Sequence, residues 1–307
     1  MQRYIIRRAG EAALALFVLS IIIFLMVRLT GDPALLMLPP DAGIEALEDL
    51  QRAMGTDKPL VVQYGLFIND YAHGSFGDSL RSKTPVSELI SDRLPNSIKL
   101  IGAAFVIVIL ISLPLGVLSA VYKGTWIDTL CTGIAVLGQA IPVFWLGMLL
   151  IQLFTVKLGW LPSSGMGGLT NYIMPAFSLG FFTVAAITRL LRSSLLEAMD
   201  SEYIKLARIK GLTEFKVIWK HALRNSLISV VTLGGIYIAI LITLGILVEV
   251  VFAWPGMGRL LFQGIVFRDF PVVQAVVMIS AAIVITTSLM VDIAYAYLDP
   301  RIRLQYG

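Results

Sequence analysis

The stretch DSEYIKLARIKGLTEFKVIWKHALRN, residues 200–225, decides how this chain is organised, because it is polar and basic and lies between two long apolar runs. Its local signals predict two short helices joined by a tight turn. Asp200 or Ser201 can cap the first helix, since a short side-chain oxygen accepts a hydrogen bond from a free N–H of the first turn. Gly211 stands where a left-handed residue ends that helix, and Thr213 can cap the second.

The faces of this insert leave two functions open. Tyr203, Ala207 and Gly211 are spaced by four residues and share one face of the first helix, and their decreasing size lets another backbone approach closely. The second helix has an apolar stripe and a basic stripe, made respectively of Phe215, Ile218, Trp219 and Ala222, and of Lys216, Lys220 and Arg224. A basic amphipathic helix can lie on anionic lipid headgroups or dock on a soluble partner.

Composition places the chain in a membrane. Of its 307 residues 57% are hydrophobic and 14% are charged, whereas soluble domains carry about 25% charged residues. A membrane-spanning helix needs roughly 20 mostly apolar residues. We therefore expect an all-α polytopic membrane protein with about six transmembrane helices. The expected spans are residues 12–27, 100–122, 129–156, 172–191, 225–248 and 270–291.

The distribution of lysine and arginine predicts the orientation of these spans. The external segment, residues 31–96, carries ten acidic and five basic residues. Basic residues instead crowd the N-terminal start, the insert and the C-terminal tail, so both termini are expected in the cytoplasm. The net charge of +4 is then a signal of topology and does not indicate binding to nucleic acid.

No pattern for catalysis or metal binding is present in the sequence. Cys131 is the only cysteine, and the expected topology places His73 and His221 on opposite sides of the membrane, so the two histidines cannot share a metal. The chain contains neither a nucleophile elbow nor an HExxH motif, and it has no GxxxxGK[ST] phosphate loop. We expect no catalytic residue, no metal site, no cofactor bound by this chain and no ATP hydrolysis by it.

Transport through the spans is the remaining function class. An ion-coupled carrier usually has ionisable residues at mid-membrane and an internal repeat, whereas Glu249 and Asp292 here are near the ends of spans, where interfacial water reaches them. Glycine and proline interrupt several spans, which is tolerated where neighbours or a cavity satisfy the freed backbone. The polar residues considered as lining a path are Gln139, Gln152, Thr232 and Tyr237.

A series of short motifs runs along almost the whole chain. They are RYIIRR at 3–8, GDP at 31–33, DKPLVVQY at 57–64, HGSFGDSL at 73–80, YIKLARIKGL at 203–212, HALRNSL at 221–227, VFAWPGMGRL at 251–260, RDFPVVQA at 268–275 and DPRIR at 299–303. In their order and spacing they resemble the membrane-spanning permease subunits of bacterial ABC importers, in the dipeptide, oligopeptide, nickel and glutathione branch.

This resemblance gives the insert a role. The family's cytoplasmic signature is Glu-Ala-Ala, three residues, Gly, and a later Ile-x-Leu-Pro, of which Ala207, Gly211 and Leu223 match the second alanine, the glycine and the leucine. Lys205, Leu206, His221 and Arg224 depart from it. By resemblance, residues 200–225 hold the coupling helix that docks on a cytoplasmic ATPase. The implied coupling residues are Tyr203, Ala207, Arg208, Lys210, Gly211 and Leu223.

The resemblance also implies a type I ABC importer permease fold in the bacterial inner membrane. Residues 1–30 would form the N-terminal tail and first span, 31–97 an external segment with amphipathic helices at 43–54 and 59–71, and 98–307 the permease core. The implied partners are a paralogous permease chain that completes a heterodimer, two ATPase subunits or domains that bind ATP and Mg, and an extracytoplasmic substrate-binding protein.

Two further expectations concern the cargo and its delivery. Peptides or a related small solute would be the cargo, and Phe252 and Trp254 would contact the binding protein. The alternative is a channel-like or ion-coupled carrier whose insert lies on lipid.

Overall fold

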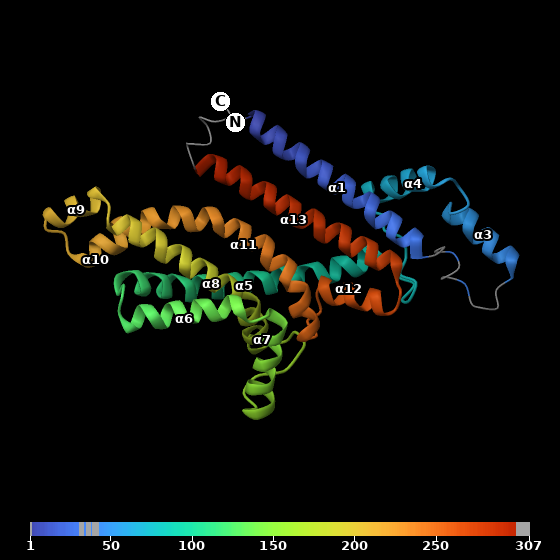
Figure 1. The fold of residues 1–307 in the computed structure, drawn as a ribbon. Coiled ribbons are helices and arrows are strands. Elements are labelled where there is room, and N and C mark those ends of the chain that lie inside the picture. The colour runs from blue at the N-terminus through green and yellow to red at the C-terminus, as the bar shows by residue number, and fades with distance from the viewer. Residues whose placement is uncertain (1, 31–33, 35–37, 39–42, 299–307) are drawn as a thin grey trace.

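The computed structural model describes residues 2–30, 34, 38 and 43–298, and this part of the chain contains helices and connecting turns but no β-strand. Figure 1 shows an elongated bundle of helices with α9 and α10 at one end and α3 and α4 at the other. The helices are α1 (Gln2–Thr30), α3 (Ile44–Met54), α4 (Leu60–Ala72), α5 (Val86–Val121), α6 (Trp126–Ala140), α7 (Val143–Leu150), α8 (Thr170–Met199), α9 (Glu202–Ile209), α10 (Glu214–Lys216), α11 (Leu223–Val251), α12 (Met257–Val266) and α13 (Phe270–Leu298), with π-helical turns η1 (Ile151–Lys157) and η2 (Val217–Ala222).

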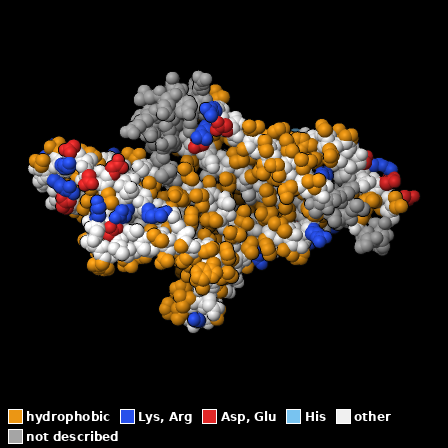
Figure 2. Space-filling view, viewed as in Figure 1, with side chains coloured by type: hydrophobic (Ala, Val, Ile, Leu, Met, Phe, Trp, Pro, Cys, Tyr) orange, Lys and Arg blue, Asp and Glu red, His pale blue; other side chains and the backbone are white. Residues whose placement is uncertain are grey.

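The apolar runs form the expected long helices. Five of them, α1, α5, α8, α11 and α13, are long and apolar enough to cross a membrane, and the count rises to six if α6 and its successor are one span. Hydrophobic side chains cover the middle of the molecule, whereas charged side chains gather toward its two ends (Figure 2). The all-α fold and the number of spans predicted from the sequence are therefore confirmed.

The third expected span is bent rather than straight. The helices Trp126–Ala140 and Val143–Lys157 meet at an angle of 107°. The break falls at Ile141, whose extended backbone (φ −90°, ψ 122°) precedes Pro142. A residue before proline is pushed out of the α region, and proline itself has no N–H to continue the helix. Residues 129–156 therefore do not form one continuous helix.

The core of the bundle is built on α5 and α8, which pack along each other. At Gly138 of α6 the backbone comes so close to α8 that an added Cβ would lie 2.7 Å from the carbonyl oxygen of Phe181. Three buried clusters follow one another along the bundle. The first, which includes Leu191 and Leu195, joins α5, α8 and α11 to the insert. The others are centred on Leu179 and Trp254, and on Val86 and Val276.

The external segment contains the two predicted amphipathic helices, now seen as α3 and α4. The α4 helix packs on the first span, where Tyr64 Oη and Ser20 Oγ share a hydrogen bond of 2.7 Å. Arg28 Nε also donates to Gln63 Oε1 at 2.7 Å. These polar contacts fix α4 against α1, so at least this part of the segment is anchored to the bundle.

Candidate functional site

The insert begins with the predicted helix and turn. Gly211 has φ +76° and ends α9 in a double hydrogen bond, because Gly211 N–H donates to Arg208 O at 2.9 Å and Leu212 N–H donates to Ala207 O at 3.3 Å. This is the Schellman pattern of helix termination. The prediction of a left-handed glycine at this position is therefore confirmed.

The predicted caps are only half correct. Ser201 and Thr213 stand at the N-cap positions of α9 and α10, but neither side chain bonds a free N–H of its helix. Ser201 Oγ instead donates to Ala198 O of the preceding span. The turn is closed by an ion pair that sequence reasoning missed, in which Arg208 Nε lies 2.8 Å from Glu214 Oε1.

The insert has an inner and an outer face. Ile204, Ala207, Val217, Ala222 and Leu223 are buried in the cluster that also contains the ends of α5 and α8. Two of the six predicted coupling residues, Ala207 and Leu223, are therefore held inside this chain. They can position the insert, but their side chains do not form its exposed surface.

The outer face carries large apolar side chains. We call these side chains the insert patch: Tyr203, Leu206, Ile209, Phe215 and Trp219. Ile209 is 81% exposed and Phe215 is 70% exposed, although apolar side chains of this size are usually buried. Arg208, Lys210 and Gly211 lie beside the patch and are also exposed.

The insert continues into the long helix α11 without a break. Residues Glu214–Lys216 pass through the π-helical turn η2 directly into α11. The second predicted helix is thus the beginning of a long continuous helical segment. A displacement of the insert would therefore move the end of α11 with it.

An ion pair between a buried carboxylate and a partly exposed guanidinium holds the same end of the bundle together. Asp128 of α6 accepts two hydrogen bonds from Arg192 of α8, each 2.8 Å long. The carboxylate also accepts bonds from Ser119 Oγ at 2.7 Å, Gly124 N–H at 3.0 Å and Thr132 Oγ1 at 3.2 Å. Because its donors come from three helices, this carboxylate connects α5, α6 and α8.

Three of the four residues considered for a path have described side chains, and each has different surroundings. Gln139 accepts a hydrogen bond from Arg189 Nη2, so a guanidinium lies beside it. Gln152 is exposed on η1, and Tyr237 packs against the cluster that holds the insert. The side chain of Thr232 is outside the described residues. Their role in a path stays a prediction.

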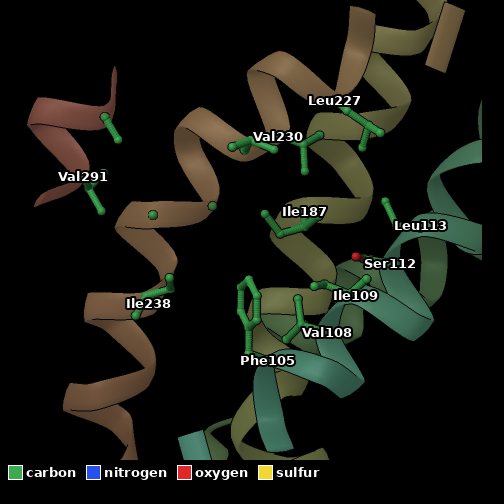
Figure 3. A pocket seen from close by; sticks show the side chains of 14 residues that line it. Phe105, Val108, Ile109, Ser112, Leu113, Ile187, Leu227, Val230, Ile238 and Val291 are labelled. Atoms are coloured by element: carbon green, nitrogen blue, oxygen red, sulfur yellow. The ribbon is translucent and has the colours of Figure 1, made fainter. Parts of the chain in front are cut away.

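A cavity of about 330 Å³ lies between α5, α8, α11 and α13. Figure 3 shows side chains of α5 and α8, such as Val108 and Ile187, facing Val230 and Ile238 of α11. Its one lining hydroxyl, Ser112 Oγ, has no hydrogen-bond partner within the described residues. A cavity with such an apolar wall offers few hydrogen-bond partners to a peptide backbone. It does leave empty space beside α11.

The expectation for Phe252 and Trp254 is wrong in this structure. Both side chains are buried, and Trp254 is 0% exposed. The indole Nε1–H of Trp254 donates to Asn96 O at 3.0 Å, and its ring meets Tyr172 edge-on at a centroid distance of 4.6 Å. These aromatic side chains fill the core beneath the α11–α12 turn and are not available to a binding protein.

The carboxylate of Glu249 is also buried, at 2% exposure, rather than reached by interfacial water. Its Oε2 accepts a hydrogen bond of 2.6 Å from Gly258 N–H, and this bond folds α12 back onto the end of α11. Asp292 is partly exposed and lies 3.5 Å from Arg8 Nη1. Glu249 thus has a structural role at the α11–α12 turn.

The fold and this loop together define a class, an all-helical polytopic membrane subunit with an exposed apolar and basic loop at one end. Groups of three or more residues able to hold a metal ion are absent from the described part of the chain. The sequence matches the family described as binding-protein-dependent transport system inner membrane component over residues 112–304, and its N-terminal companion over residues 1–101. The chain belongs to this family and is the permease subunit of a binding-protein-dependent ABC importer of the inner membrane.

Relatives and solved structures agree with this membership. The chain is 38% identical to a putative peptide transport system permease protein of Brucella abortus and 38% identical to the glutathione transport system permease protein GsiC of Escherichia coli K12, with 99% of each chain covered. A solved methionine ABC transporter, described as inward facing, matches with a TM-score of 0.58 at 20% identity, over 69% of this chain and 96% of that one. An amino acid ABC transporter matches with a TM-score of 0.56 at 16% identity, over 69% and 94%.

Proposed function

We propose that this chain forms one half of the translocation path for a peptide or a related small solute, such as glutathione. The names of the full-length relatives support this class of cargo. The other half would come from a paralogous permease chain in a heterodimer. Residues 1–30, 31–97 and 98–307 would act as the N-terminal span, the external segment and the permease core.

The insert patch is the observation that carries the coupling role. Five large apolar side chains project from a loop whose other face is locked into the bundle. An exposed apolar patch with basic neighbours fits a groove on a soluble partner. We infer that two ATPase subunits or domains, which bind ATP and Mg, dock on this loop and its counterpart in the paralogous chain. Their closure would move η2 and α11 and open the path alternately to each side.

The purified chain alone is expected neither to bind nor to hydrolyse ATP, because its sequence contains no phosphate loop. Reconstituted with its paralogous chain, the ATPase subunits and the binding protein, it should support ATP-dependent uptake in liposomes. The measurement is uptake of labelled peptide with and without ATP and ATPase subunits. Uptake by this chain alone, driven by an ion gradient, would instead favour an ion-coupled carrier.

The acidic external segment and the basic insert are expected on opposite sides of the membrane, with both termini in the cytoplasm. Glu48 on α3 and Lys210, directly after α9, are both exposed and suit single-cysteine labelling. In a Cys131→Ala background, Glu48→Cys should react with an impermeant thiol reagent added outside, and Lys210→Cys only after the membrane is opened. The reverse pattern would overturn this orientation.

A further inference from the structure

A second cavity, of about 270 Å³, lies against α12. Figure 1 shows that α12 is far from the insert helices α9 and α10. It is formed by the start of α5, the end of α12, the start of α13 and the turn at residues 79–82. Polar side chains contribute a large share of its wall, which distinguishes it from the apolar cavity beside α11. The lining residues that matter here are Arg81, Arg93, Gln263, Phe267 and Asp269.

The single carboxylate in this wall is already fully engaged. Asp269 is buried and accepts hydrogen bonds from Ser79 Oγ at 2.5 Å, Leu80 N–H at 3.0 Å and Arg81 N–H at 3.4 Å. These bonds fix the turn at residues 79–81 to the start of α13. No salt bridge joins Asp269 to a guanidinium within the described residues. The carboxylate therefore builds the cavity but does not pair with either arginine.

Two guanidinium groups remain without an acidic partner. Arg81 lies over the ring of Phe267, with Cζ 3.5 Å from the ring centroid. The side chain of Arg93 makes no hydrogen bond and no ion pair with any other described residue. The external segment has twice as many acidic as basic residues, yet none of its described carboxylates reaches these two side chains. With one carboxylate and two guanidiniums, the wall carries a net charge of +1 and suits a singly charged anion.

The cavity lies at the level where the chain enters the membrane. The charge-free run of α13 starts at Phe270, directly after Asp269. Arg93 precedes the charge-free run of α5, which begins at Leu100, by seven residues, or about 10 Å of helix. Such positions fall in the headgroup region that borders the hydrocarbon core. Phe267 follows α12, lines the cavity and is 50% exposed. The exposed apolar side chains of α12 itself, Phe262, Ile265 and Val266, lie on the other side of that helix from the lining residues.

We propose that this cavity binds a phospholipid, with the phosphodiester between Arg81 and Arg93 and the adjoining apolar part of the lipid against Phe267. A phosphodiester carries one negative charge and accepts hydrogen bonds from guanidinium groups, often in pairs. A carboxylate from a docked protein would satisfy the same charge, but it would leave the exposed ring of Phe267 uncovered. The lipid accounts for both the charge and the apolar surface.

The test uses the assembled transporter in nanodiscs that contain phosphatidylglycerol with a photoactivatable group in its acyl chain. After illumination, mass spectrometry locates the labelled residues, which are expected in α12 and the start of α13. Replacing both arginines, Arg81→Gln with Arg93→Gln, should reduce this labelling about tenfold or more, because both charge-assisted bonds to the phosphodiester are lost. Lys83→Gln removes a charge from the same turn outside the cavity and should leave the labelling unchanged.

Recovery of the ATPase subunits with each variant shows that the assembly is intact before labelling is compared. Unchanged α12 labelling in the double variant would overturn the proposal. An equal loss of labelling in Lys83→Gln would also overturn it, because removing any positive charge from this turn would then have the same effect. If the double variant keeps its lipid labelling but needs more binding protein for half-maximal ATPase stimulation, the occupant is a protein carboxylate and the lipid assignment is wrong.

Discussion

Replacing Asp128 with alanine is expected to destabilise the bundle more than any other single change at a polar side chain near the insert. The substitution leaves Arg192 without its carboxylate and removes the acceptor for Ser119 and Gly124. The Asp128 carboxylate is buried, but the Arg192 side chain is 30% exposed, so water can solvate the charge that remains. The loss of the hydrogen bonds to the carboxylate should cost about 2–3 kcal/mol. The measurement is the apparent Tm of the purified chain in detergent, together with its yield from membranes.

Two substitutions calibrate this prediction. Ser119→Ala removes one hydrogen bond to the same carboxylate and should cost about 1 kcal/mol. Glu202→Ala breaks the exposed ion pair with Lys205 and should leave the Tm almost unchanged, because water screens both charges. The double variant Asp128→Ala with Arg192→Ala should lose less stability than the sum of the two single variants, because neither charge is left alone. A wild-type Tm in Asp128→Ala would show that this pair does not hold the bundle end.

The spans and the end of α9 could be predicted because their signals are local. Long charge-free runs mark the helices, and Gly211 ends α9 wherever the helix lies. The break before Pro142 is also a local signal, but a run of 28 residues without charge conceals it when length alone is considered. The angle of 107° depends on what α7 packs against, which is α8 and α11.

The ion pair and the buried aromatic side chains could not be predicted, because their positions depend on packing between distant segments. Asp128 and Arg192 are separated by 64 residues, and nothing in either local sequence shows that they meet. Trp254 follows a span and precedes a Pro-Gly turn, where an aromatic side chain at a membrane interface and one in a core have the same sequence context. Its contacts with Asn96 of α5 and Tyr172 of α8, both distant in sequence, place it inside.

Gly211→Val is expected to abolish transport while leaving the chain inserted in the membrane. Gly211 has φ +76°, a conformation in which a β-branched residue is a steric outlier, so the substitution should cost on the order of 1–3 kcal/mol of local strain. An added Cβ would meet nothing within 4 Å, so the strain comes from the backbone alone. Relief of that strain would unwind the end of α9 and displace Leu206 and Ile209 of the insert patch.

Docking of the ATPase should therefore fail, and transport with it, although the clusters that hold the long helices together lie mostly elsewhere in the bundle. The matched control is Lys216→Ala, because Lys216 is exposed near the patch and its backbone is helical. Both variants are brought to equal membrane levels, and ATPase co-purification and peptide uptake are then measured on each. The control should retain most of both activities. Full uptake with normal ATPase recovery in Gly211→Val would contradict the assignment of residues 200–225 as the coupling loop.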